Sequence, residues 1–246
     1  MVSGEGITNP SSEGEGPVTD NRVGGFLALR RKPPLINQAK KEKCAFLPCL
    51  KTGVSCTIFY EFIDFLAFVN QQLATKDIPR LEMLLMPANF SSMVGEFVIA
   101  SIPKYCPTLV KNRYHNGHPD LIPAGHYPGN RVQYAHEGIE VKASRYLRGW
   151  QGHNPENVWL MVFAFESNRD RDIVVVEDEM DNLAQPSVQS IPFQFLLVVG
   201  AQLEQSDWRF SARSATSRRT ITASVADSGY RKMMQNWIYK APALRK

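Results

Sequence analysis

The segment from Gly138 to Ser144 constrains the fold of this chain more than any other part of the sequence. Its residues alternate, so Glu140 and Lys142 share one face of an expected strand and the apolar residues share the other. A continuously apolar strand is predicted after it, over residues 158–165. With helical patterns before them, these strands predict an α/β protein with a mixed central sheet of about five strands flanked by helices.

A second acidic residue is expected to lie beside this strand. Asp120 follows Pro119 and precedes an apolar pair, so it belongs on or next to a short strand. Residues 123–130 are rich in glycine and proline, which predicts a turn. The two strands would then be antiparallel neighbours, and Asp120, Glu140 and Lys142 can meet at one point.

This combination of side chains suits the hydrolysis of a phosphodiester. Two converging carboxylates can hold a hard divalent cation such as Mg²⁺, which prefers oxygen ligands. A neighbouring lysine can orient a water molecule or lower its pKa, and the cation stabilises charge on a phosphate. The alternative is a surface aspartate beside an ordinary glutamate–lysine pair on the solvent face of a strand.

The same residues resemble the motif of the PD-(D/E)XK superfamily, the restriction-endonuclease-like nucleases. The match consists of Pro119, Asp120, Glu140 and Lys142 and covers the middle of the chain. It implies a restriction-endonuclease-like fold and a Mg²⁺-dependent DNA endonuclease. Asp120, Glu140 and the carbonyl of Val141 would bind the metal, and Lys142 would position the attacking water.

The resemblance also implies further site residues. In many relatives a helix before the first motif supplies an extra acidic metal ligand, and Glu96, in a helical pattern over 91–102, resembles it by position. The alternative for Glu96 is a solvent-facing side chain. In this superfamily the region after the second motif often contacts DNA, which points to Arg145, Arg148 and Gln151.

The C-terminal part of the chain is basic. From residue 207 onward there are nine lysines and arginines against two acidic residues. Alternating segments at 207–213 and 219–225 predict a basic β-hairpin extension whose tip would carry Arg213, Arg218 and Arg219. Such a ribbon can grip double-stranded DNA. A solvated, solubilising hairpin is the alternative.

These features favour a sequence-specific type II restriction enzyme. Such enzymes commonly act as homodimers, because two active sites cut the two strands of a symmetric site. One alternative is a nuclease of the same superfamily in DNA repair or recombination, which would cut by structure instead of sequence. Another is a non-catalytic nucleic-acid-binding protein, which would bind without metal and leave the strand intact.

Length and composition set the outer limits. The chain has 246 residues and a net charge of +4. Residues 1–25 predict a disordered tail, and 26–246 a single nuclease-like domain with a core at about 58–203 and a basic extension at 204–246. The sequence shows neither a membrane span nor a signal peptide, so a cytoplasmic location is expected.

The remaining patterns predict individual elements. Helices are expected over 58–73, 78–86 and 91–102, a strand over 172–177, a buried strand over 193–203, and a short helix or anchoring segment over 230–239. The four cysteines have spacings that match no strong zinc pattern, so reduced, packed cysteines are expected, with a structural zinc site as the alternative. They are Cys44, Cys49, Cys56 and Cys106.

Overall fold

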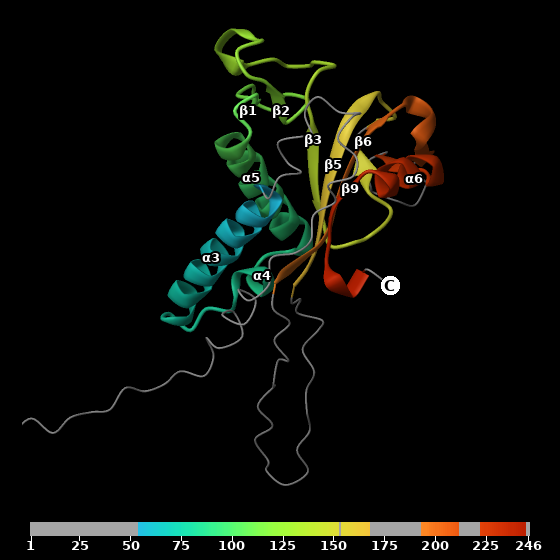
Figure 1. Ribbon diagram of the computed structural model, residues 1–246. Coiled ribbons are helices and arrows are strands. Elements are labelled where there is room, and N and C mark those ends of the chain that lie inside the picture. The colour runs from blue at the N-terminus through green and yellow to red at the C-terminus, as the bar shows by residue number, and fades with distance from the viewer. Residues whose placement is uncertain (1–53, 153, 168–192, 212–221, 245–246) are drawn as a thin grey trace, which may run out of the picture. The chain divides into compact units, whose positions relative to one another are not determined.

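The computed structural model describes residues 54–152, 154–167, 193–211 and 222–244, all within the unit Lys32–Lys246 (Figure 1). The expected N-terminal tail and the expected strand at 172–177 lie outside these residues. The helices are α3 (Val54–Ala74), α4 (Leu81–Leu84), α5 (Pro87–Tyr105) and α6 (Asp227–Gln235). The strands are β1 (Leu109–Lys111), β2 (Leu121–Pro123), β3 (Glu140–Ser144), β4 (Gln151–Gly152), β5 (Val158–Glu166), β6 (Gln194–Leu203), β7 (Trp208–Ser211), β8 (Thr222–Val225) and β9 (Trp237–Lys240).

The largest sheet in the described part of the chain has four strands in the order β3-β5-β6-β9 (Figure 1). Strands β3 and β5 run parallel, with Glu140 opposite Leu160 and Lys142 opposite Val162. The pairs β5–β6 and β6–β9 are antiparallel. The expected α/β class with a mixed sheet is therefore confirmed, with four strands among the described residues where about five were expected.

Both faces of β5 are buried, which explains why its sequence is continuously apolar instead of alternating. Met161 and Phe163 belong to a core shared with α3 and α5. Leu160 and Val162 belong to a second core on the opposite face, formed with α6 and with the sheet β4-β8-β7. The site strand β3 lies at the edge of this two-sided arrangement, beside β5.

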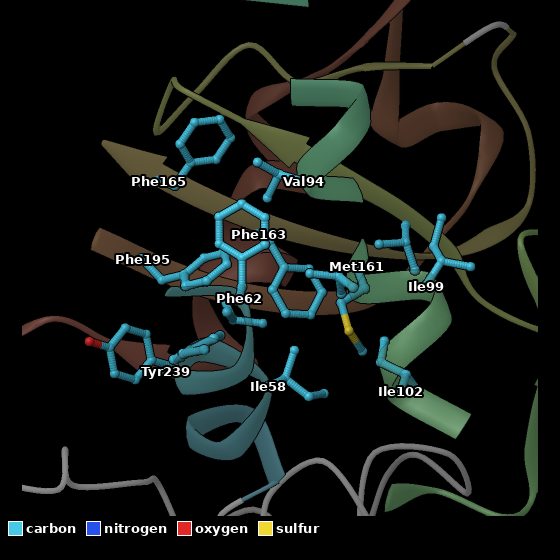
Figure 2. Close-up of a cluster of buried hydrophobic side chains, with 14 of the residues drawn as sticks. Ile58, Phe62, Val94, Ile99, Ile102, Met161, Phe163, Phe165, Phe195 and Tyr239 are labelled. Carbon is cyan, nitrogen blue, oxygen red and sulfur yellow. The ribbon is translucent and has the colours of Figure 1, made fainter. Parts of the chain in front are cut away.

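Aromatic rings fill much of the first core (Figure 2). The ring of Phe59 in α3 stacks on Phe195 in β6 with 4.3 Å between centroids. The ring of Phe62 lies 4.7 Å from that of Phe193, and both side chains are fully buried. Burying such large rings is among the strongest stabilising contributions in a core. It attaches α3 to the sheet, while α5 packs against β3.

The second core also orients the loop before β5. Trp208 of β7 is buried, and its indole N–H donates a 2.9 Å hydrogen bond to the carbonyl of Glu156. Strands β7 and β8 pair antiparallel. Their connection, which carries Arg213, Arg218 and Arg219, lies outside the described residues.

Two predicted helix boundaries are wrong. The helix expected over 78–86 is reduced to α4, four residues long. The helix expected over 91–102 begins earlier, with Pro87 in its first turn, and continues through Pro103 to Tyr105. Proline disfavours a helical residue before it. Here burial of Ile102 and Cys106 in the first core outweighs that preference, because both side chains are fully buried.

The C-terminal segment is more regular than expected. The stretch at 230–239 divides into the end of α6 and the edge strand β9, so it both forms a helix and joins the central sheet. Cys106 is disulfide-bonded, which corrects the expectation of a reduced thiol at this position. Among the described helices, none has the length and apolar character needed to cross a membrane.

Candidate active site

The strand that follows Asp120 lies antiparallel to the segment that leads into β3. The amide of Leu121 donates a 3.0 Å hydrogen bond to the carbonyl of Ile139, and the amide of Ile139 donates a 2.8 Å bond in return. This exchange is the hydrogen-bonded pair of an antiparallel ladder. The predicted antiparallel pairing is therefore present only at this isolated bridge, because β2 pairs with β1 and β3 pairs with β5. The bridge nevertheless brings the two parts of the motif side by side.

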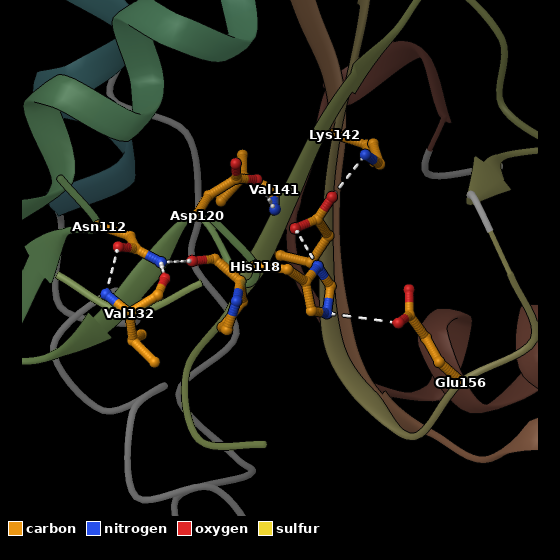
Figure 3. Close-up of polar contacts among 9 residues, drawn as sticks. Asn112, His118, Asp120, Val132, Val141, Lys142 and Glu156 are labelled. Atoms are coloured by element: carbon orange, nitrogen blue, oxygen red, sulfur yellow. Dashed lines mark hydrogen bonds and ion pairs between the residues drawn. The ribbon is translucent and has the colours of Figure 1, made fainter. Parts of the chain in front are cut away.

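The structure brings together Asp120, Glu140, Val141 and Lys142 (Figure 3). The backbone N–H of Val141 donates a 2.9 Å hydrogen bond to Oδ2 of Asp120. The Lys142 ammonium lies 2.5 Å from Oε1 of Glu140. Glu140 is only 8% exposed, so the alternative of an ordinary solvent-facing glutamate is wrong.

Burial and mutual repulsion dominate the electrostatics of the carboxylate pair. Burial, followed by the negative charge of Glu140, raises the pKa of Asp120 to about 7, although the Val141 amide and Lys142 act in the opposite direction. A buried carboxylate beside a second one disfavours the ionised form unless a cation lies nearby. A cation bound between the two carboxylates would relieve this repulsion.

Glu140 is the member of the pair that stays ionised. Burial alone would raise its pKa, but hydrogen bonds from His118 and Lys142 outweigh burial and lower it to about 2. Nδ1 of His118 lies 3.1 Å from Oε2 of Glu140, and Nε2 lies 3.5 Å from Oε2 of Glu156. Burial would lower the pKa of His118, whereas these carboxylates raise it overall.

His118 and Glu156 also contact the site, although neither is among the site residues predicted from the sequence. His118 directly precedes the Pro119-Asp120 pair, and this adjacency is a signal that could have singled it out. Glu156 becomes a neighbour only because β5 runs parallel to β3, with Leu160 opposite Glu140. The loop before β5 then ends beside the start of β3, a relation that depends on strand register.

Comparison with known proteins is a separate line of evidence. No protein-family model, no curated protein and no solved structure matches this chain. The chemistry proposed for the site therefore rests on the arrangement of its own residues.

The donor set suits a hard cation with oxygen ligands. Asp120 and Glu140 supply carboxylates, and Val141 supplies a carbonyl on the strand edge that faces Asp120, because a strand residue directs its N–H and C=O to the same edge. No three His, Cys, Asp or Glu side chains in the described part of the chain form a ready-made metal cluster. Water or phosphate oxygens would have to complete the coordination, as is common for Mg²⁺.

Glu96 lies apart from these contacts. Its carboxylate is 2.6 Å from the ammonium of Lys111, and its side chain is 63% exposed. No contact among the described residues joins it to Asp120 or Glu140. The structure thus fits the solvent-facing alternative for Glu96 and does not support its expected role as a metal ligand.

Arg145 is buried, so the structure does not support the predicted DNA contact at this position. It is 9% exposed, and its Nη1 donates hydrogen bonds to the carbonyl and hydroxyl oxygens of Ser167. Its guanidinium lies 5.0 Å from the ring centroid of Phe90. Arg145 directly follows the last residue of β3, and its guanidinium also lies 5.3 Å from the ring centroid of Phe165 in β5, so it packs on the helix-covered core.

Replacing Arg145 with alanine is therefore expected to lower stability instead of nucleic-acid affinity. The change removes two hydrogen bonds and the packing on Phe90, and we expect a loss of about 2 kcal/mol in the free energy of unfolding. Urea denaturation measures this loss. Arg148→Ala, at an exposed position, is the control; equal stability of the two variants would contradict a structural role for Arg145.

The other predicted DNA contacts have different outcomes. Arg148 is exposed, and its guanidinium lies 4.4 Å from the ring centroid of Tyr230 in α6. Gln151 is exposed in β4. Both side chains remain accessible to a ligand.

Proposed function

We propose that this chain is a Mg²⁺-dependent endonuclease that hydrolyses phosphodiester bonds in DNA. The observation that carries the proposal is the carboxylate pair of the buried Glu140 and the half-buried Asp120, with the Lys142 ammonium 2.5 Å from Glu140. Two carboxylates that repel each other destabilise a fold, and a bound divalent cation would offset the charge that Lys142 and His118 leave uncompensated. The resemblance to the PD-(D/E)XK motif agrees with this chemistry.

The roles of the side chains follow from their contacts. Asp120, Glu140 and the Val141 carbonyl would hold the Mg²⁺, which when bound stabilises negative charge on the phosphate. The Val141 amide orients Asp120 through its 2.9 Å hydrogen bond. Lys142 would position the attacking water, and His118 holds the Glu140 carboxylate from the side opposite Lys142.

The narrower proposal is a type II restriction enzyme, acting as a homodimer on double-stranded DNA. Of the residues expected to contact duplex DNA, Arg148 and Gln151 are exposed, and Arg145 is buried. The three arginines of the expected hairpin tip lie outside the described residues. Support for this version therefore comes mainly from the motif and from the basic C-terminal part of the chain.

A second candidate is a nuclease of DNA repair or recombination that recognises unpaired or structured DNA. One observation favours it specifically: the ring of Tyr134, 51% exposed, stacks on His118 at 5.4 Å between centroids, directly beside the carboxylates. An exposed ring at such a site is suited to stack on a base.

The test is cleavage by the full-length protein of supercoiled plasmid, linear duplex and single-stranded phage DNA, in Mg²⁺ and in EDTA. We expect cleavage in Mg²⁺ alone, and a rate at least about 100-fold lower for Lys142→Ala, since positioning groups of this kind contribute on that order. Lys104→Ala removes an exposed lysine from α5 and serves as the matched control.

The substrate that is cut separates the candidates. Discrete fragments from duplex DNA support the restriction version, and cutting confined to single strands or junctions supports the repair version. Intact DNA of every form in Mg²⁺ and Mn²⁺ would overturn the nuclease proposal and leave a nucleic-acid-binding protein.

A further inference from the structure

A group of exposed aromatic and basic side chains adjoins the carboxylate site. We call it the aromatic loop surface, and it consists of Arg113, Tyr114, Arg131, Tyr134 and His136. Tyr114 is 38% and Tyr134 is 51% exposed, and the other three are exposed as well. Among the described residues, no ion pair engages Arg113 or Arg131.

Two loop segments that form this surface are joined by one buried side chain. Asn112 is 6% exposed, and its Nδ2 donates to the carbonyls of Pro119, at 3.1 Å, and Val132, at 2.8 Å (Figure 3). Its Oδ1 accepts from the amides of Tyr114, at 3.0 Å, and Val132, at 3.2 Å. A fully used buried amide rigidifies the backbone around it. The rings are therefore presented on a preorganised loop.

Further backbone bonds hold the two arginines and the site together. The amide of Arg113 donates a 2.9 Å hydrogen bond to the carbonyl of Asn130, which places Arg113 beside the segment that carries Arg131. The amide of His118 donates to Gln133, and the amide of Ala135 donates to His118, so the segments around 118 and 134 pair in parallel.

The surface reaches the carboxylates through Tyr134. Its ring lies nearly parallel to that of His118, with an interplanar angle of 20°, and His118 contacts Glu140 at 3.1 Å. The ring of His136 meets Tyr134 edge-on, at 90° and 5.3 Å between centroids. One face of the Tyr134 ring thus contacts His118, His136 lies at right angles to it, and half of the Tyr134 surface is exposed to solvent.

Such rings suit bases whose faces are uncovered. In a duplex each base is covered by the base pairs above and below it, so a protein ring can stack only on an unpaired or extruded base. Neighbouring arginines can bind the phosphates of the same strand bidentately.

We propose that the aromatic loop surface binds unpaired bases of a polynucleotide and directs the adjacent carboxylate site to phosphodiesters in unpaired strands. This inference rests on the proposed nuclease function for its catalytic half. The claim that the surface binds unpaired bases depends only on the exposed rings and the two arginines.

The test measures binding without cleavage. Full-length protein in EDTA is titrated into a fluorescently labelled oligonucleotide, either single-stranded or as a blunt duplex of the same sequence. We expect the single strand to bind at least about 10-fold more tightly than the duplex, since one stacked base contributes on that order. Tyr114→Ala and Tyr134→Ala should each weaken single-strand binding by about 5- to 100-fold.

The controls separate stacking from other effects. Tyr114→Phe and Tyr134→Phe keep the rings and should retain binding. Phe68→Ala removes an exposed ring from α3, 62% exposed, and should leave binding unchanged. Equal affinity for the two DNA forms, or alanine variants that bind like Phe68→Ala, would overturn the inference.

A cleavage assay of forked DNA in Mg²⁺ distinguishes this inference from the nuclease proposal. If the protein binds single strands selectively but cleaves nothing, the nuclease proposal is overturned and so is the directing of cleavage, while the proposed base-binding role of the surface stands. If duplex DNA is cleaved and the tyrosine variants cleave it as the wild type does, the nuclease proposal stands and the proposed role of the aromatic loop surface is overturned. Cutting in the unpaired arm, reduced by Tyr114→Ala, supports both.

Discussion

Asp120→Asn is expected to abolish Mg²⁺-dependent cleavage while making the metal-free protein more stable at neutral and alkaline pH. Removal of a ligand carboxylate should lower the cleavage rate by at least about 1,000-fold, the scale on which sites lose activity without a principal charge-stabilising group. Asparagine can still accept the hydrogen bond from the Val141 amide, so the local backbone should be retained. Cleavage of a DNA substrate by the wild type and the variant measures the first effect.

The stability gain follows from the direction of the pKa shift. The pKa of Asp120 is raised to about 7 from its ordinary 3.8, so ionisation is harder in the folded protein than in the unfolded chain. The metal-free wild type should therefore lose stability as pH rises from about 4 to about 7, and lose no more above that range. Asp120→Asn removes this loss, and we expect a gain of about 1–3 kcal/mol near pH 8 and little change near pH 3, below both pKa values.

Thermal unfolding with and without Mg²⁺ tests this second effect. The wild type should gain Tm when Mg²⁺ is added, because a ligand that binds only the folded state stabilises it, and the variant should not. Asp77→Asn is the matched control, since Asp77 is exposed and has a φ of 53°, a conformation that asparagine tolerates. Equal Mg²⁺ shifts in the wild type and Asp120→Asn would contradict a metal site at Asp120.

Gly138→Ala is expected to unfold the site and to destabilise the whole chain by roughly 3 kcal/mol or more, the range of severe backbone clashes. Gly138 has a φ of +136°, and a Cβ there would lie 2.2 Å from the Leu121 carbonyl oxygen and 2.5 Å from Cγ of Pro119. That carbonyl accepts the 2.8 Å hydrogen bond from Ile139. The clash therefore breaks the pairing that brings Asp120 to Val141.

The control separates the clash from backbone strain. Gly125 also has a positive φ, +72°, but a Cβ there meets nothing within 4 Å. Gly125→Ala should cost only about 1–2 kcal/mol, the strain of a left-handed alanine. Urea unfolding of both variants measures the difference, and a Gly138→Ala variant as stable as Gly125→Ala would show that the bridge tolerates a side chain.

Local pattern was sufficient for the centre of the site. Alternation from Gly138 to Ser144 predicted that Glu140 and Lys142 share a strand face, and the turn residues predicted an antiparallel neighbour carrying Asp120. The first holds, because side-chain direction in a strand depends only on the two-residue period. The second holds only at the isolated Leu121–Ile139 bridge, because β2 ends at Pro123, β3 begins at Glu140, and the two strands belong to different sheets. The burial of Arg145, which follows the last residue of β3, was not predicted, because it depends on contacts with Phe90 and Ser167.

Tertiary structure decided the features that depend on distant parts of the chain. Glu156 meets His118 only because β5 lies parallel to β3 in one register, and residues 230–239 become partly an edge strand only because β6 offers an unpaired edge. Helix α5 passes through Pro103 because the core buries Ile102 and Cys106. Periodicity and turn chemistry reach across a few residues, so the sequence by itself determined the strands and their carboxylates. Register, helix ends and the partners of buried charges depend on packing between segments far apart in the chain, which only the folded structure specifies.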